Sequence, residues 1–165
     1  MNETGVITAK PVSSVRKTIT VAATQARAFQ VFTSGISSWW PLQSHHIGAV
    51  AAKSTVIEPR VGGRVYEIGV DGSECNWGRV RVWDPSQRLV FAWEINAEWK
   101  HDVNVASEVE VRFIIEGPKQ VRVELEHRKL ECYGARALEM RGQFDSPGGW
   151  AGILATYGKA AGTSE

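Results

Sequence analysis

The spacing of hydrophobic and polar positions predicts a strand and then short helices near the start of the chain. Residues 14–21 alternate between the two classes and are rich in β-branched side chains, which is typical of a strand. Residues 24–33 place apolar side chains at helical spacing behind Thr24, a common helix cap, and so predict a helix. Gly35 and Pro41 bracket a second, very short helical or turn segment.

The spacing then changes to alternation, with six strand-like runs between residues 54 and 128. Most of the runs are joined by short turn sequences, which favours an antiparallel meander. In the later runs one parity is apolar and the other carries charged residues such as Glu94 and Glu110, which predicts one buried and one solvated sheet face. The apolar parity comprises Leu89, Phe91, Trp93, Ile95, Val109, Val111, Phe113, Ile115, Val121, Val123, Leu125 and His127.

Helical spacing returns after Pro147, a residue that suits a first helical turn. One apolar stripe is formed by Trp150, Ile153, Leu154, Tyr157 and Ala161. Because the apolar sheet face is the large surface left to cover, this helix is expected to pack against it. The sequence thus predicts an α+β fold: a curved antiparallel sheet of about seven strands around a long C-terminal helix, with two short helices after the first strand.

Composition fits a single domain, which we place at residues 14–161 behind a flexible arm at residues 1–13. The chain has 165 residues with 19 Lys and Arg against 18 Asp and Glu, so neither nucleic acid nor an anionic membrane is an expected partner. It has no apolar segment of membrane-spanning length and no signal-like start, so a cytoplasmic location is expected. Cys75 and Cys132 stand alone and are expected to be free thiols.

Aromatic residues and histidines gather between residues 35 and 49, where Trp39, Trp40, His45 and His46 stand close together. One interpretation is that the tryptophans plug the core. The other is that they form the aromatic wall of a small-molecule site with His45 as a polar group at its edge. The sequence leaves both open, and His46 is expected to point to solvent.

Glu67 is the carboxylate of most interest, because it shares its parity with Val65 while Tyr66 takes the other. If Val65 faces inward, Glu67 is an acid in an apolar chamber, where His45 or His127 would serve as its acid/base partner. The alternatives are an exposed glutamate and a strand-end histidine bonded to a carbonyl. These three residues lack local metal-ligand spacing, and no metal or cofactor is predicted.

Four residues of the outer parity surround residue 80. Arg79 and Arg81 are expected to face solvent and to pair with acids on neighbouring strands. Trp77 and Trp83 share this parity unless a bulge intervenes, and their exposure would mark the contact of a homodimer.

Several stretches carry a resemblance to a known family: FTSGISSWWPLQSHHIG, EPRVGGRVYE, DGSECNWGRVRVWDPSQRLVFAWEI, SEVEVRFI, VELEH and SPGGW. In this order they resemble the SRPBCC superfamily, and within it the proteins similar to the C-terminal domain of the heat-shock-protein ATPase activator. The resemblance covers about residues 14–160 and implies the START-like, helix-grip fold. Members enclose a cavity between helix and sheet, which different branches use for lipids, hormones or aromatic polyketides.

The leading hypothesis is therefore a protein that binds a small apolar or aromatic molecule between the sheet and the C-terminal helix. The alternatives are a cyclase or hydrolase that uses Glu67 with His45 or His127, and a chaperone-associated interaction domain, which the family alone implies. The side chains expected to bind the ligand are Trp39, Trp40, His45, Glu67, Trp93, Phe113, His127, Trp150 and Tyr157.

Overall fold

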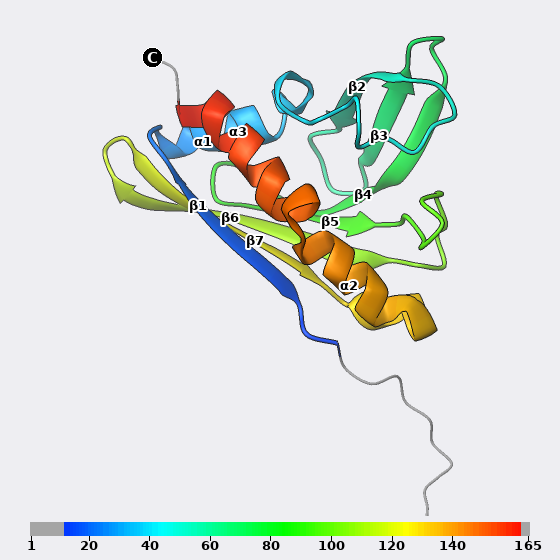
Figure 1. Cartoon of the computed structure of the whole chain (residues 1–165). Helices are drawn as coiled ribbons and strands as arrows, with labels where there is room; N and C mark the ends of the chain where they lie inside the picture. The colour runs from blue at the N-terminus through cyan, green and yellow to red at the C-terminus, as the bar shows by residue number, and fades with distance from the viewer. Residues whose placement is uncertain (1–11, 163–165) are drawn as a thin grey trace, which may run out of the picture.

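A computed structural model describes residues 12–162, in which one curved sheet carries helices across one face (Figure 1). Nearly all of the arm expected at residues 1–13 lies outside the described residues. The sheet has seven strands in the order β1-β7-β6-β5-β4-β3-β2, and all neighbours are antiparallel. The strands are β1 (Val15–Val21), β2 (Ala52–Ile57), β3 (Arg64–Gly69), β4 (Glu74–Asp84), β5 (Arg88–Trp93), β6 (Ser107–Gly117) and β7 (Gln120–Arg128). The predicted meander is confirmed.

Two short helices follow β1, as predicted: α1 (Gln25–Phe32) and the 3-10 turn η1 (Ile36–Ser38). The Thr24 side chain caps α1, because its hydroxyl accepts the Arg27 backbone N–H at 3.2 Å. These elements carry the chain from the edge strand β1 to the segment that holds Trp39 and Trp40.

The C-terminal region contains the predicted helix, α3 (Gly152–Gly162), behind a π-type turn, η3 (Pro147–Ala151). Every member of its predicted stripe is buried. Gly158 lets α3 approach β1 closely, since a Cβ there would lie 2.5 Å from Ile19 Cδ1. The sequence did not predict the preceding η2 (Leu130–Arg136) and α2 (Ala137–Asp145), which place few apolar side chains inward. No helix within residues 12–162 is long and apolar enough to cross a membrane.

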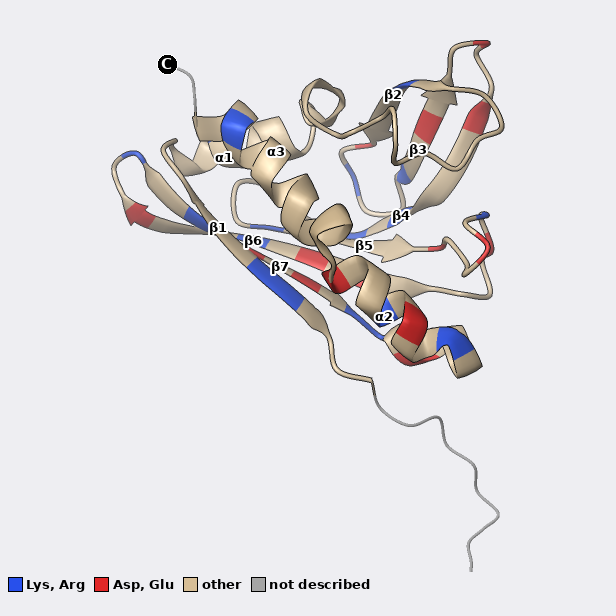
Figure 2. Cartoon of the chain, viewed as in Figure 1, with Lys and Arg blue, Asp and Glu red and all other residues tan. Residues whose placement is uncertain are grey.

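The buried sheet face has the predicted parity, except that Ile115 is 61% exposed at the end of the β6–β7 hairpin. The opposite face was predicted to be solvated, but the structure shows that parts of it are buried. Glu94 and Glu110 are each only 3% exposed there. Figure 2 shows basic and acidic positions side by side along these strands.

Arginine side chains surround the buried carboxylate of Glu110 and compensate its charge. Its carboxylate accepts hydrogen bonds from Arg88, Arg112 and Arg128. Burial opposes its ionisation, but these arginines outweigh burial and lower the pKa of Glu110 to about 2. Glu94 pairs in the same way with Arg79 and His101.

A β-bulge decides which way Trp77 points. In the pairing of β3 with β4, Val65 lies opposite Gly78 and Tyr66 opposite Asn76, so Trp77 is an extra residue. Trp77 therefore turns to the buried face and is 2% exposed. Gly78 is required at this point, because a Cβ there would lie 1.6 Å from the Ala92 carbonyl oxygen.

Trp83 is also not exposed on the outer face as predicted. It is partly buried, and its ring centroid lies 5.1 Å from that of Phe29. The outer-face pair expected of Trp77 and Trp83 is thus absent, and with it the argument for a homodimer contact. Arg79 and Arg81 are exposed, as predicted.

Candidate ligand-binding site

Four tryptophans from distant parts of the chain form a closed ring of contacts on the buried side of the sheet. Trp40 follows η1, Trp77 lies on β4, Trp93 ends β5 and Trp150 lies in η3. Their ring centroids are 5.1 Å apart for Trp40 and Trp77, 6.5 Å for Trp77 and Trp93, 5.6 Å for Trp93 and Trp150, and 6.0 Å for Trp150 and Trp40. These spacings are those of favourable aromatic pairs, so the ring is a continuous aromatic wall.

Three of these indoles are fixed by hydrogen bonds of their N–H groups. Trp40 Nε1 donates to the His45 carbonyl at 2.9 Å, Trp77 Nε1 to Glu67 Oε1 at 2.7 Å, and Trp150 Nε1 to His127 Nδ1 at 3.0 Å. Trp93 Nε1 is buried and has no hydrogen-bond partner within residues 12–162. Because the N–H groups of three rings are used by the protein, those rings have apolar carbon surface to offer a ligand.

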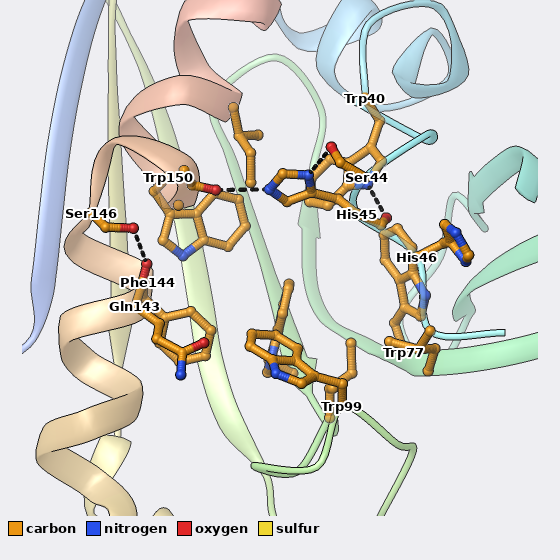
Figure 3. A pocket seen from close by; sticks show the side chains of 16 residues that line it. Trp40, Ser44, His45, His46, Trp77, Trp99, Gln143, Phe144, Ser146 and Trp150 are labelled. Atoms are coloured by element: carbon orange, nitrogen blue, oxygen red, sulfur yellow. Dashed lines mark hydrogen bonds between the residues drawn. The ribbon is translucent and has the colours of Figure 1, made fainter. Parts of the chain in front are cut away.

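The tryptophans line a cavity of about 510 Å³ between the sheet, the segment after η1 and the C-terminal helices (Figure 3). A fifth tryptophan, Trp99, reaches it from the β5–β6 connection. Polar groups of Ser44, His45, Gln143 and Ser146 also reach it. The complete lining is Trp40, Ser44, His45, His46, Ile47, Trp77, Trp93, Ile95, Trp99, Gln143, Phe144, Ser146, Gly148, Gly149, Trp150 and Ile153.

His45 joins two segments at the cavity. Its Nε2 lies 2.7 Å from the Gly148 carbonyl oxygen and its Nδ1 lies 2.7 Å from Ser44 Oγ (Figure 3). A carbonyl oxygen only accepts, so Nε2 carries a proton, and in the neutral ring Nδ1 accepts the Ser44 hydroxyl proton. The hydroxyl, the imidazole and the carbonyl therefore form a chain in which Nδ1 is the basic atom.

Glu67 faces inward with Val65 and is 1% exposed, so the inward alternative is the one found. Its oxygens accept the backbone N–H groups of Ile47 and Gly48 at 2.7 and 2.9 Å, and the Trp77 indole N–H at 2.7 Å. No hydrogen bond or ion pair within residues 12–162 joins Glu67 to either proposed acid/base partner. The carboxylate instead anchors residues 47 and 48, which directly follow the His45–His46 pair.

His46 differs from its expected place in solvent. It is partly buried, with Nδ1 3.9 Å from Glu67 Oε2. In Figure 3 its ring points away from the middle of the cavity. Cys75 lies beside Gly48, where a Cβ would be 3.2 Å from its Sγ. Both Cys75 and Cys132 are free thiols, as predicted. Burial raises the pKa of each thiol, for Cys132 to about 11, so neither is an activated nucleophile.

His127 lies behind the aromatic wall and is 0% exposed. Since Nδ1 accepts from Trp150, the ring proton is on Nε2, which donates to Ser107 Oγ at 2.7 Å. Its ring is 4.3 Å from that of Phe144. Burial lowers the pKa of His127 to about 3, so it is uncharged near neutral pH and acts as a fixed support for Trp150.

The other predicted site residues lie in the core beside the cavity. Trp39 donates to the Val31 carbonyl at 2.7 Å and packs against Tyr157, and Tyr157 donates to the Ala28 carbonyl at 2.8 Å. Phe113 packs edge-on to Phe29 and Phe32. These three side chains do not line the cavity, whereas Trp40, His45, Trp93 and Trp150 do.

Sequence reasoning missed several lining residues. Trp77 was assigned to the outer face unless a bulge intervened. For Gly148, the paired glycines in SPGGW were the one sequence signal of the turn that brings its carbonyl to His45. Ser44, Trp99, Gln143 and Phe144 had no signal in the alternation pattern, because they lie in loops or on the unpredicted α2.

Comparison with known proteins gives a family match over residues 22–155, to the family described as Activator of Hsp90 ATPase homolog 1-like protein. None of the curated proteins matches the chain significantly.

Solved structures resemble the chain over nearly its whole length. An anthrahydroquino-gamma-pyrone synthase, Txn09, is 40% identical, with 90% of this chain and 96% of that chain covered and a TM-score of 0.63. The self-sacrificing resistance protein CalC from Micromonospora echinospora is 31% identical, covers 92% and 97%, and has a TM-score of 0.68. The Aha1 dimer from Colwellia psychrerythraea is 13% identical, covers 92% and 98%, and has a TM-score of 0.60, which shows the shared fold alone.

Proposed function

The chain belongs to the Activator of Hsp90 ATPase homolog 1-like family, and we propose that it binds a small, flat aromatic molecule in the tryptophan-lined cavity. The ring formed by Trp40, Trp77, Trp93 and Trp150 is the observation that carries this proposal. Indole faces combine large contact area with defined stacking geometry, which suits ligands made of fused rings.

Size and polarity support the same ligand class. The cavity volume of about 510 Å³ lies within the range of roughly 300 to 1,000 Å³ common for small-molecule sites. Its polar side chains are few and include Ser44, His45 and Gln143. A ring system with hydroxyl or carbonyl groups along one edge would match this arrangement. The likeness to a synthase named for an anthrahydroquinone-type compound points in the same direction.

The proposal can be tested by blocking the cavity from a residue whose replacement spares the core. Gln143 is an exposed residue of α2 that lines the cavity, whereas Leu138, on the same helix, is 76% exposed and does not. Binding of anthraquinones, flavones and naphthols would be followed by quenching of tryptophan fluorescence and by calorimetry. Gln143→Trp should weaken binding about tenfold or more, and Leu138→Trp should not. No saturable binding, or equal effects of the two variants, would contradict the proposal.

A second candidate function is ring closure on the bound molecule, favoured by the 40% identity to a synthase and by the chain from Ser44 through His45 to the Gly148 carbonyl. A ligand hydroxyl would pass its proton to Ser44 Oγ while Ser44 passes its own to His45 Nδ1. The resulting oxyanion would add to an unsaturated ketone of the same ligand, forming a C–O bond, and the proton would return to the carbon beside the ketone.

The reaction can be tested with ortho-hydroxychalcone, whose phenol closes on its own unsaturated ketone without a co-reactant. Wild type should accelerate closure over buffer, and His45→Gln should lower the rate roughly 100-fold. His46→Gln is the matched control: His46 also borders the cavity, but its ring points away from the middle of the cavity and it takes no part in the chain from Ser44 to Gly148. Absence of acceleration by wild type, or equal rates for the two variants, would reject this candidate.

A further inference from the structure

Trp99 has a backbone conformation that large side chains rarely adopt. Its φ is 62°, in the left-handed region, where Ser86 and Lys129 are the other non-glycine residues among those described. This region costs an L-residue with a Cβ conformational energy, and a bulky aromatic residue there is an outlier. Such strain persists where the surroundings enforce it, and it is concentrated at functional sites.

The turn around Trp99 is held by the side chain of Asn96. Its Oδ1 accepts the backbone N–H groups of Glu98 and Lys100, both at 3.0 Å. The Trp99 N–H donates to the Asn96 carbonyl at 2.9 Å, and the Asn96 N–H donates to the Lys100 carbonyl at 2.8 Å. The conformation of Trp99 is therefore imposed by its neighbours.

The same turn is also tied to the body of the protein. Glu98 pairs with Arg136 of η2 at 2.6 Å, and Ile95 pairs with His101 in an isolated β-bridge. His101 in turn bonds to the buried Glu94 at 2.9 Å. These contacts on both sides of Trp99 hold its backbone in place beside the cavity.

Trp99 is the exposed member of the aromatic lining. It is 40% exposed, while the four tryptophans of the ring are at most 7% exposed. Its ring stands edge-on to Phe144 at 6.2 Å, and in Figure 3 it lies across the cavity from His45. A ligand resting on the tryptophan ring would therefore have its outer surface beside Trp99.

We propose that Trp99 is a specificity-determining residue that stacks on the outer surface of the bound ligand. This inference rests on the proposed binding function and adds a selection rule to it. With Trp99 stacked on one surface of the ligand and the inner tryptophans on the other, the site would favour flat ring systems over saturated, puckered ones of the same outline. The strained conformation is the cost of directing an indole at this position.

The test compares dihydroxyanthraquinone with its saturated counterpart, a perhydroanthracenediol, by calorimetry on the full chain. Wild type should bind the flat probe at least about tenfold more tightly, and Trp99→Gly and Trp99→Ala should lose most of that difference. Trp99→Phe, which keeps a ring, should retain most of the affinity. Val103→Ala is the control, since Val103 is exposed in the same connection but does not line the cavity.

Thermal unfolding tests the strain separately. Trp99→Gly should melt about 2 to 4 °C above Trp99→Ala, although glycine ordinarily destabilises relative to alanine. Ser86→Gly removes a similar left-handed residue in the β4–β5 turn, at the opposite end of β5 from Trp99, and should leave affinity unchanged.

Each contrary result has a distinct meaning. Equal affinity of wild type and Trp99→Gly for the flat probe overturns the role of Trp99 and leaves the proposed function standing. Equal binding of the two probes by wild type overturns the selection rule. No binding of either probe by wild type overturns both this inference and the proposed function.

Discussion

Mild acid should destabilise the protein through His127. His127 is fully buried, and its pKa falls from an ordinary value of 6.5 to about 3 because burial disfavours the charged ring. Below pH 6.5 the unfolded chain binds a proton at this residue, whereas the folded protein does not until about pH 3. The stability that depends on a neutral His127 is therefore present above pH 6.5 and is lost as the pH falls.

The size of the effect follows from the difference between the two pKa values. Near pH 7 the ring is mostly neutral in both states, whereas at pH 5 it is almost fully protonated in the unfolded state and hardly at all in the folded state. The free energy of unfolding should fall by about 2 kcal/mol over this interval, or about 4 to 8 °C in melting temperature. Glu110, with a pKa near 2, contributes only at lower pH, when its unfolded form begins to protonate near 4.5.

The assay is urea denaturation at several pH values, with wild type compared to His127→Gln. Glutamine can accept from the Trp150 indole through its oxygen and donate to Ser107 through its nitrogen, but it does not titrate. Other groups cancel in the difference between the two proteins. The variant should be less stable at pH 7 and should lose about 2 kcal/mol less than wild type on going to pH 5. Parallel stability curves for the two proteins would refute the reasoning.

Further changes test other parts of the structure by chemical denaturation. Leu154→Ala should cost about 2 to 5 kcal/mol because a buried side chain beneath α3 is lost, and an unchanged midpoint would contradict the packing. Glu67→Gln should cost about 2 to 3 kcal/mol, since an amide cannot accept all three N–H groups; a neutral effect would mean that the anchor is unimportant. Gly78→Ala should cost about 3 kcal/mol or more, or prevent folding, because the new Cβ would meet the Ala92 carbonyl, and wild-type stability would disprove the bulge. The Glu110 contribution should be lost as pH falls from 4.5 toward 2, and Glu110→Gln should flatten that part of the curve.

The sheet and its covering helix could be predicted because their signals are local and periodic. Alternation along β5 to β7 identified the buried parity, and helical spacing after Pro147 identified the stripe that includes Leu154. For Glu67 the alternation showed only that it shares a face with Val65, and the sequence left open whether that face is buried; the structure shows both side chains buried.

Other features depend on pairings that one sequence does not display. Trp77 faces the cavity because β4 has one residue more than its partner strand, and no parity count reveals such an insertion. His45 meets the carbonyl of Gly148, which lies 103 residues away. Trp99 owes its position to a backbone angle that a tryptophan would not be expected to adopt. The contact of His45 determines the polar edge of the cavity, and the position of Trp99 determines its outer wall.

The extra residue in β4 also bears on how cavities of this family can diverge. Because Trp77 reaches the interior through register, deletion of a single residue beside Gly78 would restore regular pairing and send the indole to the outside. Such a deletion would enlarge the cavity by a whole side chain without replacing any lining residue. Insertions and deletions in this strand are therefore a route to new ligand shapes, and an alignment that compares cavity residues only column by column would overlook it.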